Sequence, residues 1–395
     1  MSFFQNWRCT NCGNEYELDE VHYLCPQCSK KWCADVLICT KWIGSAPLIG
    51  VLEALFDYPA IKQEWDKQPY HGLFSVLEEK FYPSLPVGNT PLFRPERLNK
   101  NLNLPNLFIK NDALNPSGSL KDRASQLVVA DAIRLGIDKI VCASTGNAAS
   151  SLASICAAAG KEAIIFVPKS IPEAKLIQIK VHKAKLYTVS GTYDDAFNSA
   201  LAYSANNDCL NRNTAFNPLT IEGKKSAGIE IFLQLNDVPD WIIIPVGDGV
   251  ILGGIYKAFK DLKSAGIIEK LPKLLSVQAE SSDAITSYWE TGTYHNANHP
   301  YTIADSISVK TPANAHWAVN ALYQTQGKSV RVSDEEILSD QKYLAQMTGI
   351  FAEPSSAAVF SGLKKGLAQK WIKPEDKIVL LITGTGLKDI NAVRL

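Results

Sequence analysis

The chain has 395 residues, and its forty Lys and Arg side chains are balanced by forty Asp and Glu side chains. This length exceeds what one compact core usually holds, so we expect two domains or one large α/β unit with an appendage. The zero net charge argues against nucleic acid or a membrane surface as the main partner, because both favour a basic excess. No signal-peptide pattern opens the chain and no apolar run reaches about 18 residues, so we expect a soluble, cytoplasmic protein.

Six of the nine cysteines lie within the first forty residues. Four of them form two Cys-x2-Cys pairs separated by twelve residues: Cys9 with Cys12, and Cys25 with Cys28. This spacing predicts a zinc ribbon at residues 1–40, in which four thiolates surround one structural metal and leave no open position. The alternative is four unrelated thiols or a redox pair. Cys33 and Cys39 are surplus, and we expect them to be buried thiols rather than ligands.

Residues 41–85 are rich in proline, aromatic and charged side chains, and their clearest pattern is a short helical one at 73–81. We interpret this segment as an arm that connects the ribbon to the main domain. A loop at 86–92, with the sequence Pro-Val-Gly-Asn-Thr-Pro-Leu, opens that domain.

Strand and helix patterns alternate through the rest of the chain, which is typical of parallel strands joined by helical crossovers. The expected strands lie at 107–110, 139–143, 163–167, 185–189, 241–246, 274–279 and 377–383. The expected helices lie at 124–135, 148–159, 173–182, 193–204, 223–235, 253–263, 335–347 and 356–369. The predicted fold class is therefore α/β with parallel twisted sheets.

One lysine, Lys121, lies where a strand, a tight loop and a helix meet, in the sequence Asn-Pro-Ser-Gly-Ser-Leu-Lys-Asp-Arg of residues 115–123. The Pro-Ser-Gly turn lets backbone N–H groups face a ligand, and Ser119 is the candidate N-cap of the helix. Such a lysine is either a solvated surface charge or a positioned amine. This segment alone favours the surface charge, because most lysines are solvated.

Two further loops follow predicted strands, where ligands bind in open α/β sheets. The loop at 143–150, Ala-Ser-Thr-Gly-Asn-Ala-Ala-Ser, offers hydroxyls and helix N-terminal N–H groups that suit a carboxylate, or it is a simple N-cap turn. The loop at 245–254 contains glycines that let several N–H groups approach a phosphate, or it is a plain glycine turn. It lacks the lysine of a triphosphate loop and the dinucleotide pattern. Asp248 is unfavourable beside a phosphate, so we expect its side chain to turn away.

The last strand is followed by Thr-Gly-Thr-Gly-Leu-Lys-Asp at 383–389. A neutral hydroxyl at this edge can form one hydrogen bond to the nitrogen of a heterocycle. In order and distance, this loop and the three stretches above resemble the pyridoxal-phosphate enzymes of the tryptophan synthase β fold, also called fold type II. Within that group the chain is most similar to the threonine synthases. The resemblance covers about residues 85–395, and the ribbon is similar to one at the front of some members.

The resemblance implies a two-domain catalytic core at 86–395 with a smaller subdomain at about 124–225. It also implies that Lys121 forms a Schiff base with pyridoxal phosphate, that Asn147 contacts its phenolic oxygen and that Thr383 faces its pyridine nitrogen. The implied phosphate cradle is Gly247, Asp248, Gly249, Val250 and Ile251. The implied substrate-binding residues are Ser144, Thr145, Gly146 and Asn217. Residues 304–308 are expected near the site, without an assigned role.

For a threonine synthase the implied reaction converts O-phosphohomoserine and water to threonine and phosphate. Lys121 would remove the α proton and later return a proton, with the cofactor as electron sink. A hydroxyl at the pyridine nitrogen favours elimination and replacement over transamination. The partner implied is a small amino-acid substrate, and the expected assembly is a homodimer.

The chain departs from the family pattern at 217–223, Asn-Pro-Leu-Thr-Ile-Glu-Gly, where Thr220 occupies the position of an expected phosphate-binding arginine. Four cations are candidates to replace that arginine, although we expect each to be a solvated charge: Lys110, Arg212, Lys224 and Lys225. The departure keeps a second hypothesis open, which is β-replacement on O-phosphoserine, as in cysteate synthase, or β-elimination on serine or threonine. A third treats the ribbon as a nucleic-acid or protein-binding module on a catalytically idle core.

Overall fold

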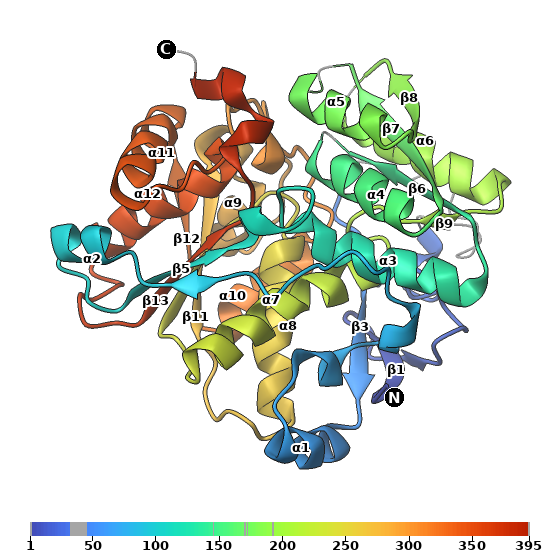
Figure 1. The fold of residues 1–395 in the computed structure, drawn as a ribbon, viewed down its shortest axis with the longest axis horizontal. Helices are drawn as coiled ribbons and strands as arrows, with labels where there is room; N and C mark the ends of the chain where they lie inside the picture. The colour runs from blue at the N-terminus through green and yellow to red at the C-terminus, as the bar shows by residue number, and fades with distance from the viewer. Residues whose placement is uncertain are drawn as a thin grey trace.

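The computed structural model describes residues 2–31, 46–144, 146–169, 171, 173–191 and 193–393. Two parallel sheets and a small N-terminal sheet organise these residues, with helices packed around them (Figure 1). The predicted α/β class is therefore confirmed. None of the described helices combines the length and the apolar composition needed to cross a membrane.

In the larger sheet, three of the predicted loops follow strands that are neighbours. Its strand order is β12 (Lys328–Val332), β11 (Lys273–Ala279), β10 (Trp241–Pro245), β13 (Ile378–Ile382), β5 (Leu107–Asn111) and β4 (Leu92–Phe93). All neighbours are parallel except β4 and β5. Because β13 lies between β10 and β5, the loops that follow these three strands open at one edge of the sheet.

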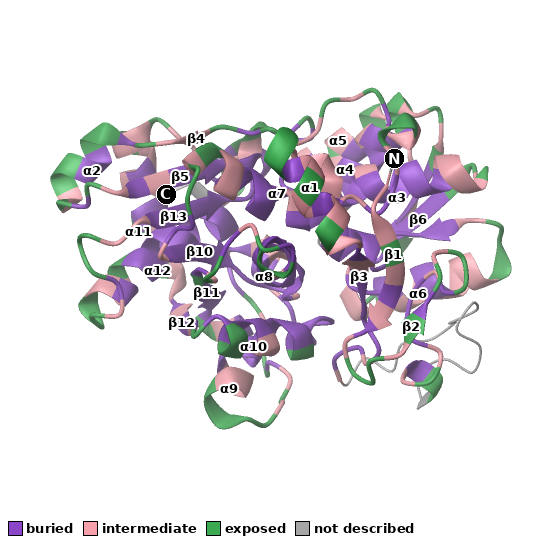
Figure 2. Cartoon of the chain, turned by 90° about the horizontal axis from the view of Figure 1, so that it is seen from below, coloured by how far each residue is buried: buried purple, intermediate pink, exposed green. Residues whose placement is uncertain are grey.

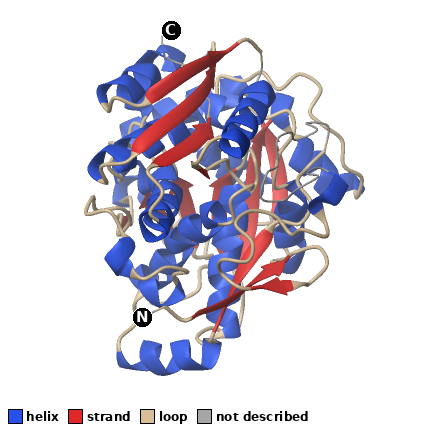
Figure 3. Ribbon diagram, turned by 90° about the vertical axis from the view of Figure 1, so that its right-hand side faces the viewer, coloured by secondary structure: helices blue, strands red, loops and turns tan. Residues whose placement is uncertain are grey.

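Both faces of this sheet are covered, which explains its continuous apolar strands. Successive side chains of β10 alternate between faces: Ile243 belongs to a core with α12 (Pro354–Ala368), and Ile242 and Ile244 belong to a core with α8 (Val250–Ser264). All three are fully buried. Figure 2 shows the strands in the buried colour, and Figure 3 shows helices on both sides of them.

The smaller sheet has the order β8 (Lys185–Val189), β7 (Glu162–Pro168), β6 (Lys139–Ala143) and β9 (Leu210–Asn211), and every pair is parallel. Helices α4 (Asn147–Ala158) and α6 (Tyr193–Asn206) pack on it. Two helices, α3 (Lys121–Leu135) and α7 (Leu219–Leu235), pack on each other. Helix α3 begins at Lys121, directly after the loop at 115–120.

The predicted alternation agrees with the observed elements to within a few residues at most boundaries. The other helices of the two sheets are α2 (Glu96–Leu102), α5 (Glu173–Val181), α9 (Ala284–Thr291), α10 (Ala315–Gln324) and α11 (Asp334–Thr348). Prediction missed α2, α9, α10, β4, β9 and β12, which are short or lack a clear period. The pattern at 73–81 corresponds to two 3-10 turns, His71–Phe74 and Glu79–Phe81.

The N-terminal sheet joins the cysteine segment to the segment interpreted as an arm. Its order is β2 (Glu15–Tyr16), β1 (Phe4–Cys9) and β3 (Leu52–Phe56), followed by α1 (Tyr58–Lys67). Strand β3 pairs antiparallel with β1, so the sheet of the cysteine segment continues to Phe56. Cys33 and Cys39 lie outside the described residues.

The N-terminal sheet is packed against the core rather than set apart from it. The Tyr23 ring stacks on Phe216 with centroids 4.5 Å apart, and its hydroxyl accepts a hydrogen bond from the Asn211 amide at 2.9 Å. The Leu48 amide donates to the Ala313 carbonyl, also at 2.9 Å. These contacts connect the cysteine segment to β9, and the start of the following segment to the residues just before α10.

Candidate active site

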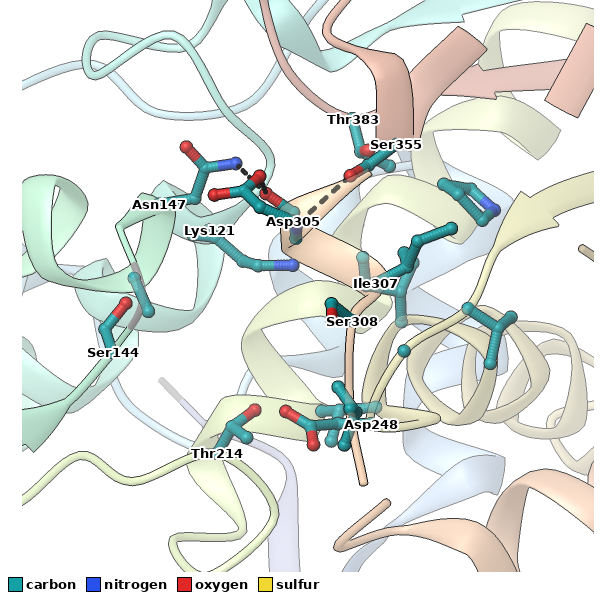
Figure 4. Close-up of a pocket in the computed structure, with 18 of the residues that line it drawn as sticks. Lys121, Ser144, Asn147, Thr214, Asp248, Asp305, Ile307, Ser308, Ser355 and Thr383 are labelled. Carbon is teal, nitrogen blue, oxygen red and sulfur yellow. Dashed lines mark hydrogen bonds between the residues drawn. The ribbon is translucent and has the colours of Figure 1, made fainter. Parts of the chain in front are cut away.

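Lys121 lies at the start of α3, in the middle of a pocket (Figure 4). The preceding loop is tied to the end of β13, because the Leu120 amide donates to the Thr383 carbonyl at 2.9 Å and Ser119 forms a β-bridge with Gly384. The position before the helix is occupied by Leu120, and no side chain caps the helix. The prediction that Ser119 caps it is therefore wrong.

The Lys121 amine is in a different environment from an ordinary surface lysine. The residue is half-buried and lines the pocket. Burial lowers the pKa of Lys121, while Glu353 and Asp248 act in the opposite direction. A lowered pKa increases the fraction of neutral amine, which is the nucleophilic form.

At one end of the pocket, amide and hydroxyl groups gather near Asn147. Its Nδ2 donates to both Glu353 oxygens at 2.9 Å and to Ser306 Oγ at 3.0 Å, while its Oδ1 is buried without a partner among the described residues. Thr383 Oγ1 lies 2.8 Å from Ser356 Oγ. These groups can hydrogen-bond the polar edge of a heterocycle.

At the other end, the loop after β10 forms a cradle of backbone at the start of α8. Gly249 has a φ of 83°, and a Cβ there would lie 2.8 Å from the Ala318 Cβ. A Cβ on Gly247 would lie 3.0 Å from the Ile307 Cα. A side chain is therefore strained at Gly249 and tightly crowded at Gly247. The free N–H groups of the first helical turn and its positive end suit a phosphate, so the cradle fits the phosphate of pyridoxal phosphate.

The cradle end also contains four polar or charged side chains, from three separate segments. Arg212 follows β9 and Lys224 lies on α7, and both are buried and line the pocket. Lys224 Nζ lies 3.3 Å from Thr214 Oγ1, its acceptor. Figure 4 shows the Asp248 carboxylate directed toward Thr214, on the far side of Lys121 from Asn147 and Thr383.

The structure corrects the expectation that the four candidate cations are solvated, because all four are buried. Lys110 is paired with Glu230 at 2.6 Å, and Lys225 with Glu222 at 2.5 Å and Asp261 at 3.0 Å. These two lysines therefore belong to structural ion pairs outside the pocket. Arg212 and Lys224 are the two of the four that line it.

Most of the predicted site residues converge on this pocket. It is lined by Lys121, Ser144, Asn147, Gly247, Asp248, Gly249, Val250, Ile251 and Thr383. Asn217 is not among the lining residues: its side chain donates to the Asn211 carbonyl and accepts from the Leu219 amide, within the turn that starts α7. Gly146 lies beside the pocket under the Lys175 side chain. Thr145 lies outside the described residues.

The pocket also contains residues that sequence reasoning missed or left without a role. Residues 305–309 line it, as expected for the segment near the site. Glu353 and Ser355 come from the start of α12. Their only sequence signal is an acidic residue before a proline at a helix start, which is common at helix N-termini and does not indicate a site.

The four predicted metal ligands form one cluster away from the pocket. The sulfur atoms of Cys9, Cys12, Cys25 and Cys28 all lie within 4.8 Å of one another. Two of the separations, Cys9 to Cys28 and Cys12 to Cys25, are 3.8 and 3.7 Å. A tetrahedral site with metal–sulfur bonds of about 2.3 Å places its sulfurs about 3.8 Å apart, so the four residues fit such a metal.

Comparison with known proteins agrees with this geometry. Residues 83–384 match the family of pyridoxal-phosphate dependent enzymes. The threonine synthase of Methanocaldococcus jannaschii is 36% identical over 98% of this chain and 93% of its own length. The threonine synthase of Mycobacterium tuberculosis is 33% identical over 82% of this chain and 90% of its own. This chain belongs to the pyridoxal-phosphate-dependent threonine synthases. It is a lyase whose cofactor is pyridoxal phosphate, and the predicted family is confirmed.

Solved structures share the fold at lower identity. A threonine deaminase of Solanum lycopersicum superposes with a TM-score of 0.66 at 22% identity, over 77% of this chain and 85% of that chain. Maize serine racemase superposes with a TM-score of 0.66 at 19% identity, over 83% of this chain and 93% of that chain. At such identities the likeness shows the fold alone, and it confirms the predicted fold type II.

Proposed function

We propose that this threonine synthase converts O-phosphohomoserine and water to threonine and phosphate, with Lys121 as the residue that holds pyridoxal phosphate. The observation that supports this most directly is the position of Lys121. Its amine lies between a polar end with Asn147 and Thr383 and a glycine cradle at 247–251. This order along the pocket matches the order of the polar ring edge, the reactive carbon and the phosphate in the cofactor.

Pyridoxal phosphate, when bound, supplies an electron sink for a carbanion at the substrate Cα. In the proposed arrangement Asn147 holds the phenolic oxygen, and the Thr383 hydroxyl holds the pyridine nitrogen. Thr383 Oγ1 and Ser356 Oγ form a hydrogen bond with each other. A pair of neutral hydroxyls supplies no negative charge to stabilise a protonated ring nitrogen, which favours elimination and replacement over transamination.

Lys121 Nζ is the proposed proton carrier. Since burial lowers its pKa, the released amine is able to take the proton from the substrate Cα. Proximity makes this transfer effectively intramolecular. Ser144, which is buried in the wall of the pocket, and the start of α4 are proposed to bind the substrate carboxylate. The roles proposed for Thr145, Gly146 and Asn217 stay predictions.

We also infer that the metal of the four-cysteine cluster is zinc, with a structural role. Four thiolates and no open position suit Zn²⁺ better than a catalytic metal. We further propose a cytoplasmic homodimer whose ligands are small molecules rather than nucleic acid or membrane. Metal analysis of the purified protein tests the assignment of zinc, and the mass of the protein in solution tests the homodimer.

A substrate panel tests the reaction. Purified protein is incubated with O-phosphohomoserine, O-phosphoserine, serine or threonine, and phosphate, ammonia and amino-acid products are quantified. We expect phosphate and threonine in equal amounts from O-phosphohomoserine alone. Phosphate from O-phosphoserine only, or ammonia from threonine, would instead support β-replacement or β-elimination and contradict the proposal.

A further inference from the structure

Lys224 and Arg212 are buried cations for which the described residues supply few partners. Lys224 is 2% exposed and Arg212 is 1% exposed. Lys224 forms one long hydrogen bond, to Thr214, and no ion pair within the described part of the chain. Arg212 Nε donates to Ser125 Oγ at 3.2 Å, but its Nη2 is buried without a partner among the described residues. Burying a charge is costly unless it is paired, so an anion bound in the pocket would stabilise the charged forms of both side chains.

The one carboxylate that acts on both cations is insufficient to balance them. Asp248 also lines the pocket, and its Oδ1 has no partner among the described residues. Three cations, Lys121, Lys224 and Arg212, act electrostatically on this one carboxylate. Burial and repulsion by Lys121 and Arg212 lower the pKa of Lys224, and an anion bound beside its amine would act in the opposite direction.

Lys224 lies one helical turn after position 220, where the family pattern has a phosphate-binding arginine. Thr220 is buried, and its hydroxyl donates to the Asn217 carbonyl and accepts from the Ala215 amide. Both hydrogen bonds lie within the turn that starts α7, so this hydroxyl does not replace the arginine. Lys224 follows on the same helix four residues later, and residues at this spacing share a helix face. Lys224 therefore offers positive charge one turn further along α7.

We propose that Lys224, Arg212 and Thr214 form a subsite for a phosphate monoester at the cradle end of the pocket. The two cations would pair with the phosphate oxygens and the Thr214 hydroxyl would add a hydrogen bond. The phosphate belongs either to the cofactor, where the cations offset Asp248 in the cradle, or to the substrate, where they replace the arginine absent at 220. The inference rests on the proposed function only in that both molecules are phosphate esters.

Two binding measurements separate these sources without requiring turnover. The affinity for pyridoxal phosphate is measured by absorbance titration of the cofactor-free protein, and the affinity for inorganic phosphate by calorimetry on the holoenzyme. We expect Lys224→Met to weaken one of these affinities by about tenfold to a hundredfold, the effect of losing a charge-assisted hydrogen bond. Weaker cofactor binding assigns the subsite to the cofactor; weaker phosphate binding to the holoenzyme assigns it to the substrate.

The neighbouring Lys225 provides a matched control. It is equally buried, but it is paired with Glu222 and Asp261 and does not line the pocket. Lys225→Met is therefore expected to lower the melting temperature and to leave both affinities unchanged. Lys224→Met is expected not to lower the melting temperature of the cofactor-free protein, because it removes a buried charge that has no paired carboxylate.

The proposal is overturned if Lys224→Met leaves both affinities within about twofold of wild type. A lowered melting temperature with unchanged affinities has the same meaning, because Lys224 would then be a structural counterion of Asp248. Arg212→Met provides a second variant with the same expected loss of affinity, in case Lys224→Met does not fold. A protein that fails to make threonine but binds phosphate through Lys224 contradicts the proposed reaction and leaves this inference standing.

Discussion

Two groups of buried charges lie on different faces of α7, and they differ in how completely they are paired. On one side, Lys110 and Arg123 are both bound to Glu230, with nitrogen–oxygen distances of 2.6 Å. On the other side, Lys224 faces the pocket without an ion pair among the described residues. The charges of the paired group are compensated within the fold, whereas the unpaired group is compensated only when an anion binds.

Burial and neighbouring charges have opposing effects on the pKa values of these groups. Burial alone would raise the pKa of Glu230, but Arg123 and Lys110 hold it well below its usual range. Burial lowers the pKa of the paired Lys110 as well as that of Lys121 and of Lys224, in each case more than the nearby carboxylates raise it. Lys121 and Lys224 differ from Lys110 in that they line a cavity, where a lysine with a lowered pKa is a candidate functional residue.

The largest expected effect is on the pocket side. Lys121→Ala removes both the proposed cofactor anchor and the proposed proton carrier. We expect turnover of O-phosphohomoserine to fall by more than about 10²-fold, the lower range for loss of a positioned proton-transfer group. The yellow absorbance of the lysine-bound cofactor disappears in the same variant. Near-normal turnover would show that Lys121 belongs with the structural lysines.

The next effect is on the paired side. Glu230→Gln leaves Lys110 and Arg123 buried without their shared carboxylate, which costs about 3–5 kcal/mol of unfolding free energy. Urea unfolding of the cofactor-free protein measures this loss. The pyridoxal-phosphate affinity of the folded variant is expected to be unchanged, and a loss of affinity without a loss of stability would break the distinction between the two groups.

A smaller effect concerns a neutral hydrogen bond that supports the wall carrying Arg212. Tyr23→Phe leaves the buried Asn211 amide without its acceptor, at an expected cost of about 1–3 kcal/mol in unfolding free energy. Tyr16→Phe serves as a control on the metal side, because the Tyr16 hydroxyl lies 3.1 Å from Cys25 Sγ. Equal metal content in wild type and Tyr23→Phe, together with lower stability, is the predicted result. A metal loss in Tyr23→Phe would contradict it.

Lys388 lies between the two cases, because it is buried with hydrogen bonds to the Ser117 carbonyl and Ser150 Oγ but without an ion pair among the described residues. Burial lowers its pKa to about 8, against the attraction of Glu353. Between pH 8 and about 10.4 the unfolded chain binds more protons, so stability rises with pH by at most about 1.4 kcal/mol per unit.

The comparison of wild type with Lys388→Met isolates this contribution from the other groups that titrate in the same range. Urea unfolding at several pH values between 7 and 10.5 measures it. The difference in stability between the two proteins is expected to change with pH in that window, because only wild type has the contribution of Lys388. A difference that stays constant would show that Lys388 keeps its ordinary pKa.

Local patterns in the sequence predicted the cradle and the cysteine cluster because each depends on a short spacing. Glycine is favoured where the Gly247 and Gly249 backbone approaches its neighbours, and two Cys-x2-Cys pairs are sufficient to define four candidate ligands. The alternation of strands and helices predicted the α/β class for the same reason. These features need no knowledge of which strands are neighbours.

The remaining features depend on contacts between distant segments. Strand β13 lies between β10 and β5, which brings Thr383 beside the loop of Lys121, and no local pattern gives this order. Glu353 enters the pocket from a helix whose start has no distinctive motif. The four cations were expected in solvent because charged side chains are mostly exposed, and their burial depends on partners such as Glu230 and Asp261 that only the fold brings together.

The most direct test of the account identifies the lysine that holds the cofactor. The yellow protein is treated with borohydride, which fixes the cofactor to its lysine, and is then digested and analysed by mass spectrometry. We predict that the added mass lies on the peptide that contains Lys121 and on that residue. A cofactor fixed to Lys224, to any other lysine, or to none would contradict the central claim.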